Sequence, residues 1–211
     1  MPPAVLTAHD ITAGYQKPVI TGVSLTVREG QTIGLAGPSG SGKSTLARVL
    51  ALLHKPFSGT VSIDGETVTR FRFKAAQRTS VGVLFQQPRL SVDPRFTLRQ
   101  AIAEPLPHND VEDLADLVML TADLLDRRPH EVSDGQLQRA CLARALALKP
   151  RYLICDEMTT MLDASTTAAL VAVIRAYQQE TNAGVFAISH DNTLLARWAD
   201  ETVRLSAPLP R

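Results

Sequence analysis

An octapeptide of small residues, GPSGSGKS at positions 37–44, offers the first clear chemistry in this chain. It fits the phosphate-binding pattern GxxxxGK[ST] at every fixed position, and its neighbours predict a strand before it and a helix after it. Small residues let backbone N–H groups close around phosphate oxygens, and the helix N-terminus adds positive partial charge. We expect Lys43 to reach the β- and γ-phosphates and Ser44 to bind Mg²⁺. The alternative is a chance turn rich in Gly and Ser.

A second segment, LICDE at positions 153–157, supplies two consecutive carboxylates. An apolar strand that ends in Asp156 would place this side chain at the sheet edge beside the phosphate loop, where it can hold Mg²⁺. Consecutive residues at a strand end point in different directions, so Glu157 can face the terminal phosphate and act as a general base toward water. A solvated carboxylate or a helix cap is the alternative for Glu157.

Three further side chains have positions that suggest a role at the same edge. His190 follows the apolar run VFAIS, and the carboxyl edge of an open α/β sheet is where ligands collect. Gln86 ends VGVLFQ and could bind Mg²⁺ or water through its amide. Tyr15 precedes the phosphate loop and could stack on a base, or it could be an ordinary strand aromatic.

Alternating strand and helix patterns must position these residues. They predict an α/β fold with a P-loop core, a mostly parallel sheet and an N-terminal antiparallel β part. The predicted strands span residues 19–28, 31–36, 81–86, 152–156 and 185–189, with a hairpin around Asp64 and Gly65. The predicted helices span residues 42–53, 133–148 and 165–180, and a last helix and strand are expected around residues 199–205.

A helical stretch between residues 98 and 128, broken by prolines in EPLPHND, interrupts this pattern. We interpret it as a small helical subdomain at about residues 87–149, inserted into a nucleotide-binding core at residues 1–86 and 150–211. The whole chain of 211 residues then forms one domain. Ser133 is expected to cap the helix that leads back into the core.

Composition excludes several classes of protein and partner. The formal net charge is +1, so no bulk electrostatic argument favours nucleic acid. Apolar runs such as residues 168–174 fall far short of the ~18 residues that span a bilayer, and no secretory signal is evident at the N-terminus. Cys141 and Cys155 lack metal-ligand spacing and are expected to be buried free thiols. We expect a cytosolic protein.

The segment VSDGQLQRACLARAL at positions 132–146 resembles the signature and following helix of ATP-binding cassette ATPases. Tyr15, the phosphate loop, Gln86, LICDE, Asp163 and His190 occur in the same order as in that family, over residues 6–205. FQQPRLSVDPRFTL and LLDRRPHEVSDGQLQR are similar to its peptide/nickel importer branch.

This resemblance implies a head-to-tail dimer, with an identical or a different cassette, in which each ATP lies between the P-loop of one subunit and the signature of the other. Tyr15 would stack on adenine, Asp163 would cross the interface, and Glu157, His190 and Gln86 would be catalytic. Ser44, Gln86 and Asp156 would hold Mg²⁺. The implied ATP-binding residues are Gly37, Pro38, Ser39, Gly40, Ser41, Gly42, Lys43, Ser44 and Thr45 on this chain, with Ser133, Gly135 and Gln136 serving the partner's nucleotide.

The same resemblance implies membrane permease subunits as partners, a solute-binding protein that acts indirectly, and a position at the cytoplasmic face of the cell membrane. The leading hypothesis is an ATPase subunit of an importer for nickel, a metal chelate or a peptide. The alternatives are a weakly hydrolysing regulatory half of a heterodimer, a soluble cassette protein acting on nucleic acid or ribosomes, and a P-loop kinase. Tandem cassettes or a basic patch would favour the nucleic-acid alternative, and this sequence has neither.

The chain departs from the family pattern at Asp134, which replaces the first glycine of LSGGQ. A carboxylate ~6 Å from a γ-phosphate would repel it by about 3 kcal/mol at an effective dielectric of ~20, and the alternative is that the side chain turns away. The sequence therefore predicts that this signature completes a weaker ATP site than LSGGQ does. Met158, Thr160 and Met161 also stand where the family more often has smaller residues or proline.

Overall fold

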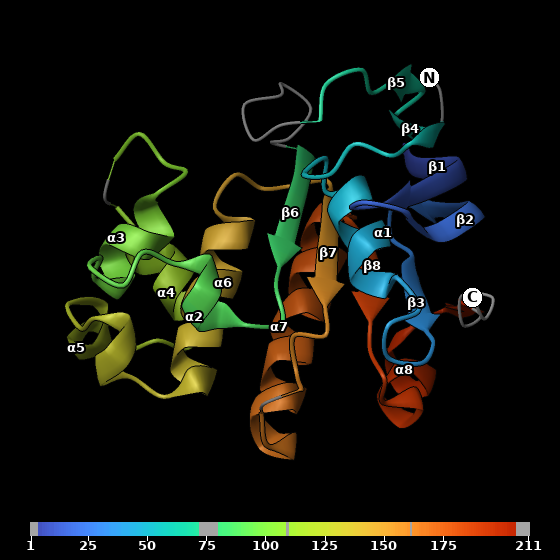
Figure 1. Ribbon diagram of the computed structural model, residues 1–211. Coiled ribbons are helices and arrows are strands. Elements are labelled where there is room, and N and C mark those ends of the chain that lie inside the picture. Colours follow the sequence, from blue (N-terminus) through green and yellow to red (C-terminus); the bar gives the residue numbers. More distant parts are fainter. Residues whose placement is uncertain (1–3, 72–79, 109, 161, 206–211) are drawn as a thin grey trace.

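Two sheets and a group of helices make up the fold in a computed structural model that describes residues 4–71, 80–108, 110–160 and 162–205 (Figure 1). The strands are β1 (Val5–Gly14), β2 (Pro18–Arg28), β3 (Thr32–Ala36), β4 (Ser58–Ile63), β5 (Glu66–Thr67), β6 (Val81–Leu84), β7 (Tyr152–Asp156), β8 (Gly184–Ile188) and β9 (Glu201–Arg204). The helices are α1 (Lys43–Leu50), α2 (Pro88–Ser91), α3 (Leu98–Ala103), α4 (Glu112–Leu117), α5 (Ala122–Leu125), the 3₁₀ helix η2 (Pro129–Glu131), α6 (Asp134–Leu146), α7 (Ala164–Thr181) and α8 (Asn192–Trp198).

The larger sheet is parallel, with the strand order β6-β7-β8-β3-β9. Strands β3, β7 and β8 are buried along their whole length, as expected for short apolar runs covered on both faces. The smaller sheet is antiparallel, with the order β2-β1-β4-β5. The predicted α/β fold with an antiparallel part is confirmed.

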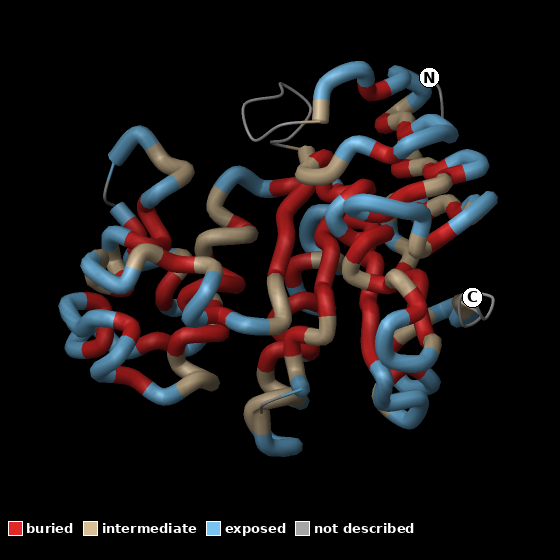
Figure 2. Tube along the Cα trace, viewed as in Figure 1, coloured by how far each residue is buried: buried red, intermediate tan, exposed pale blue. Residues whose placement is uncertain are grey.

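Two apolar cores cover the two faces of the parallel sheet, because alternate side chains of each strand point to opposite faces. Leu153 and Cys155 pack with helices α3 to α8, whereas Tyr152 and Ile154 pack with α1 and the antiparallel sheet. Figure 2 shows buried segments running through the parallel strands and exposed segments in the connections at their ends. The sheet is thus a rigid frame, and its edges carry the accessible residues.

The helices α2 to α6 lie beside the β6 edge of the sheet, away from β3 and α1 (Figure 1). Ser133 caps α6 as predicted: its hydroxyl accepts from the Gln136 N–H at 3.2 Å, and the Gln136 side chain accepts from the Ser133 N–H at 2.9 Å. The helix ends at Leu146, slightly before the predicted end. None of the helices within the described residues is long and apolar enough to cross a bilayer.

Several predicted boundaries were wrong. The sequence pattern does not predict strand β1, because register shifts and the left-handed Asp10 (φ 51°) disrupt the alternation of apolar residues. Helix α1 ends at Leu50 rather than at residue 53, since Leu52 takes a positive φ of 59°. The last helix lies at Asn192–Trp198, before the expected position, where Asp191 caps it.

Candidate nucleotide-binding and hydrolysis site

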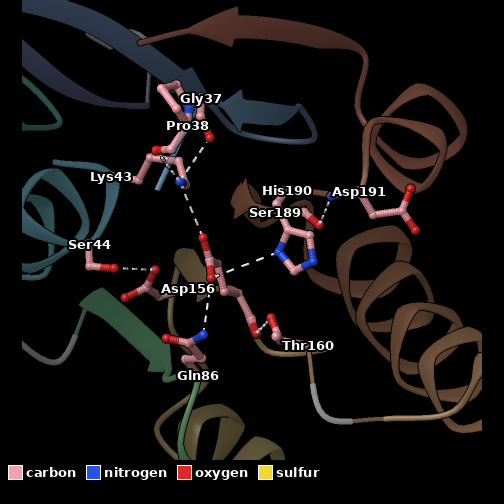
Figure 3. Close-up of polar contacts among 11 residues, drawn as sticks. Gly37, Pro38, Lys43, Ser44, Gln86, Asp156, Thr160, Ser189, His190 and Asp191 are labelled. Atoms are coloured by element: carbon pink, nitrogen blue, oxygen red, sulfur yellow. Dashed lines mark hydrogen bonds and ion pairs between the residues drawn. The ribbon is translucent and has the colours of Figure 1, made fainter. Parts of the chain in front are cut away.

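The carboxyl edge of the parallel sheet brings together side chains from four segments (Figure 3). The loop of residues 37–42 follows β3, and Lys43 and Ser44 begin α1. Asp156 is the last residue of β7. Gln86 follows β6, and His190 follows β8. Parallel strands end at the same edge, so residues that are far apart in the sequence become neighbours.

The phosphate loop is closed around the Lys43 side chain, which is buried. Its ammonium donates to the carbonyl oxygens of Gly37 at 3.0 Å and Pro38 at 3.1 Å. Gly42 caps α1 with a φ of 94°, a region that L side chains rarely adopt. The Ser41 hydroxyl is buried and has no hydrogen-bond partner within the described residues. The loop therefore presents donors that a phosphate could satisfy.

Asp156 and Ser44 form the second part of the site. The Ser44 hydroxyl donates to Asp156 Oδ1 at 3.0 Å. Burial raises the pKa of the Asp156 carboxyl, and the hydrogen bond from Ser44 opposes that shift. A buried carboxylate beside a hydroxyl is suited to a hard cation, which would replace the lost hydration.

The Glu157 carboxylate lies at the centre of the cluster. Its Oε1 is 3.3 Å from the Lys43 ammonium, and its Oε2 accepts from Gln86 Nε2 at 3.1 Å. His190 Nδ1 is 4.0 Å from the same Oε2. The Glu157 backbone has a left-handed φ of 48°, and its N–H donates to the Ile188 carbonyl at 3.0 Å. This conformation is uncommon for a residue other than glycine and turns Glu157 away from the course of β7.

Asp156 and Glu157 therefore serve different neighbours. Asp156 contacts the start of α1, whereas Glu157 contacts Lys43, Gln86 and His190. The His190 side chain is 60% exposed, so it stands at the open side of the cluster. A hydroxyl–carboxylate pair can hold a metal ion, and the second carboxylate can orient or deprotonate water.

Tyr15 lies on the connection between β1 and β2 and is 60% exposed. Arg48 of α1 donates to its hydroxyl, and the His54 ring lies 4.9 Å away at an interplanar angle of 50°. His54 Nε2 is in turn 2.8 Å from the Gly14 carbonyl oxygen. Tyr15 is thus an exposed aromatic directly after strand β1, and its stacking on a base stays a prediction.

The residues predicted to serve a partner lie apart from the phosphate loop. Ser133, Gly135 and Gln136 are at the start of α6, which lies on the β6 side of the sheet (Figure 1). The structure does not bring them to Lys43 of the same chain. A Cβ on Gly135 would come within 3.0 Å of the Thr166 methyl, so this glycine permits a close approach to α7.

Asp163 caps α7, and its carboxylate accepts from the Thr166 N–H at 2.9 Å and from the hydroxyls of Ser165 and Thr166. These hydrogen bonds, with that of Ser165 first, hold the pKa of Asp163 well below its usual range. Met158 is buried in the core, and the Thr160 hydroxyl donates to the Glu157 carbonyl at 2.9 Å. Met161 lies outside the described residues.

Sequence reasoning missed Arg48 and His54, which support Tyr15, and Arg89, which contacts Asp134. Arg89 and Asp134 are 45 positions apart, and opposite charge alone does not identify such a pair. Both cysteines are buried free thiols, as predicted. Burial raises the pKa of both thiols, which disfavours the reactive thiolate form.

A strand, a glycine-rich loop and a helix that close on a lysine, beside a strand that ends in a carboxylate, define a P-loop nucleoside triphosphatase. Similarity to known proteins identifies the family within this class. A family model described as "ABC transporter" matches residues 20–160.

Curated relatives and solved structures agree with this match. The nickel import ATP-binding proteins NikE of Escherichia coli (strain K12) and Shigella boydii serotype 4 (strain Sb227) are each 38% identical over 197 residues, which covers 88% of this chain and 74% of each relative. The dimeric structure of a bacterial ABC transporter cassette superposes with a TM-score of 0.86 at 25% identity, over 95% of this chain and 94% of that one. The fold also matches a component of a Clostridium perfringens ABC transporter complex, with a TM-score of 0.82 at 22% identity, over 98% and 88% of the two chains. The chain belongs to the ABC transporter family, as an ATP-binding and ATP-hydrolysing cassette.

Proposed function

We propose that this cassette powers a membrane importer of a small solute such as nickel, a metal chelate or a short peptide. The observation that carries the proposal is the Glu157 carboxylate, which contacts Lys43 from the P-loop, Gln86 after β6 and His190 after β8 at the sheet edge. The assignment to an importer is supported by the relatives named as nickel import ATP-binding proteins.

In this proposal ATP lies along residues 37–45, with its adenine on Tyr15. The donors of the loop and the Lys43 ammonium bind the phosphates. The Ser44 hydroxyl and Asp156, 3.0 Å apart, fit a Mg²⁺ ion, with Gln86 as a further oxygen ligand. No three His, Cys, Asp or Glu side chains in the described part of the chain form a metal-binding group, so the remaining ligands would be phosphate oxygens and water. Bound Mg²⁺ would neutralise charge on the phosphates.

Glu157 is the general base in this proposal. Its contacts with Gln86 and His190 fix the carboxylate at the sheet edge, where it can accept a proton from water. The Lys43 ammonium contacts both Glu157, at 3.3 Å, and the phosphate loop, through the Gly37 carbonyl oxygen. A γ-phosphate that binds Lys43 would weaken this ion pair and leave Glu157 available as a base.

The partner is proposed to be a second cassette, because α6 holds Ser133, Gly135 and Gln136 apart from Lys43 of the same chain. A dimer would bring the N-terminus of α6 to the other subunit's ATP and Asp163 to the interface. The dimeric assembly of the similar cassette supports this arrangement.

The helical segment at about residues 87–149 and the stretch after Gln86 would contact permease subunits, and the chain would then lie at the cytoplasmic face of the membrane. A solute-binding protein would act on the permease, and no nucleic-acid partner is proposed.

The proposal is tested by Glu157→Gln in the transporter purified with its permease subunits. Loss of the base should lower the rate of phosphate release by about 10²- to 10⁴-fold while ATP binding persists. Glu180→Gln is the matched control, because Glu180 is exposed near the end of α7. ATP binding, phosphate release and solute uptake into proteoliposomes would be measured together. Undiminished hydrolysis in Glu157→Gln would contradict the role of Glu157, and purification without permease subunits would contradict the transport role.

A further inference from the structure

All three guanidinium nitrogens of Arg89 donate hydrogen bonds to the segment that leads into α6. Its Nε donates to Asp134 Oδ1 at 2.8 Å, its Nη1 to the Pro129 carbonyl at 2.7 Å, and its Nη2 to the Val132 carbonyl at 3.2 Å. The acceptors lie on both sides of Ser133 in the sequence. The planar Arg89 guanidinium therefore binds both the backbone before α6 and the side chain of Asp134, the first residue of α6.

We propose that Arg89 is the positioning residue of the signature segment, residues 132–136: it fixes the loop from η2 to α6 and balances the charge of Asp134. The inference rests on the proposed function, in which this segment serves the ATP of a second cassette. Arg89 acts through the segment, by holding Ser133, Gly135 and Gln136 in the orientation that a γ-phosphate requires.

The charge of Asp134 is the first reason for this assignment. An unpaired carboxylate at the start of α6 would repel a phosphate that approaches the helix N-terminus. The ion pair with Arg89 removes this net charge, although both side chains are almost half exposed and solvent screens their attraction. The predicted weakness of this signature rested on repulsion by the Asp134 carboxylate, and in the structure this carboxylate pairs with Arg89 at 2.8 Å.

The position of Arg89 in the chain is the second reason. It lies in the short helix α2, three residues after Gln86. Gln86 contacts Glu157 of this chain's own site, while Arg89 contacts the segment that would serve the other site. One short connection thus fixes parts of both half-sites, and the two carbonyl contacts do so without depending on the charge of Asp134.

The test compares Arg89→Ala, Asp134→Gly and the double variant in the assembled transporter. Arg89→Ala should lower kcat for ATP hydrolysis about three- to tenfold, with an unchanged KM and unchanged nucleotide binding at this chain's P-loop. Asp134→Gly should restore part of the loss in the Arg89→Ala background, because the exposed carboxylate is then absent. The effects of the two substitutions should therefore be non-additive.

Two further variants make the test specific. Arg127→Ala removes another half-exposed arginine, which pairs with Asp123 of α5 at 3.5 Å, and should keep the wild-type rate. Arg89→Lys keeps the charge but loses the planar guanidinium, so its kcat should fall between those of wild type and Arg89→Ala. If thermal unfolding shows that Arg89→Ala does not fold, the kcat of Arg89→Lys tests the positioning role of Arg89 in its place.

The inference is overturned if Arg89→Ala, or Arg89→Lys in its place, keeps the wild-type kcat. It is also overturned if Arg89→Ala causes the same loss in the Asp134→Gly background as in the wild-type background, since the carboxylate would then play no part. The proposed function fails in a different way, namely through ATP hydrolysis that Glu157→Gln does not reduce. The two failures are therefore distinguishable in one set of preparations.

Discussion

At the scale of single residues, Tyr15 shows how an exposed side chain can be held in place by its neighbours. Its hydroxyl accepts from Arg48, and the His54 ring packs at an angle beside it. The His54 ring is fixed by its contact with the Gly14 carbonyl. A ring that is 60% exposed and held by these two neighbours would lose little freedom if a purine stacked on it.

We predict that Tyr15→Ala lowers ATP affinity about 5- to 150-fold, because stacking of a base on an aromatic ring contributes ~1–3 kcal/mol. Tyr15→Phe should keep most of the affinity, since the face remains. Titration calorimetry with ATP and with inorganic tripolyphosphate would separate the contributions of base and phosphates. An equal loss of affinity for both ligands in Tyr15→Ala would rule out stacking as the cause.

At the scale of elements, the phosphate loop joins β3 to α1 through two left-handed glycines that differ in their surroundings. Gly40 has a φ of 78°, and a Cβ there would meet nothing within 4 Å. Gly42 has a φ of 94°, and its Cβ would lie 2.3 Å from the Ile20 side chain. Backbone strain is therefore common to both positions, whereas the steric clash is specific to the helix start.

We predict that Gly40→Ala lowers the free energy of unfolding by about 1–2 kcal/mol, from backbone strain alone. Gly42→Ala should cost roughly 1–3 kcal/mol more, because β2 or α1 must shift to admit the methyl group. Chemical denaturation of both variants measures the difference. Equal losses of unfolding free energy in the two variants would show that the Ile20 side chain moves aside without an energetic cost.

The elements also show how far sequence reasoning reaches. Strands β7 and β8 are predictable because each is a short apolar run, and the Ser133 cap because capping chemistry is local. Strand β1 could not be predicted because its bulges depend on how it pairs with β2 and β4, and local sequence does not determine this pairing. The order of Asp156 and Glu157 in the chain predicts that the two carboxylates face different neighbours, whereas the contact of Arg89 with Asp134 depends on tertiary packing.

At the scale of the whole molecule, Asp64 joins the two sheets. It lies in the turn between β4 and β5 and accepts from the Tyr152 hydroxyl at 2.6 Å and from Arg151 at 2.5 Å. Arg151 also pairs with Glu29 after β2, at 2.7 Å. Since Tyr152 begins β7, this cluster fixes the antiparallel sheet against the strand that leads to Asp156 and Glu157.

Burial, aided by the hydrogen bond to Asp64, raises the pKa of Tyr152. Below the ordinary tyrosine pKa of about 10 both the folded and the unfolded chain keep the proton, so this residue gives no pH dependence there. Above that value the unfolded chain ionises while the folded chain resists, so the free energy of unfolding should fall with rising pH. Tyr177, whose pKa is also raised by burial, contributes in the same direction.

We therefore predict that Tyr152→Phe is less stable than wild type at neutral pH but loses less stability between about pH 9 and pH 11. Urea unfolding at several pH values measures both effects. Tyr177→Phe should change the profile in the same direction, because burial raises the pKa of Tyr177 as well, although its hydroxyl donates to the Pro150 carbonyl rather than to a carboxylate. If the free energy of unfolding falls equally with pH in wild type and Tyr152→Phe, Tyr152 is not a source of the pH dependence.

The strand order has a consequence for what the site accepts. Strand β8 lies between β3 and β7, so the strands that carry the phosphate loop and the two carboxylates stand about 10 Å apart at the sheet edge. Ser189 and His190 follow β8 and therefore lie between these two strands. The Lys43 ammonium reaches across this distance and lies 3.3 Å from Glu157 Oε1. A phosphate chain bound along the loop after β3 would have to cross the same distance, so its length would decide whether its last phosphate arrives at Glu157.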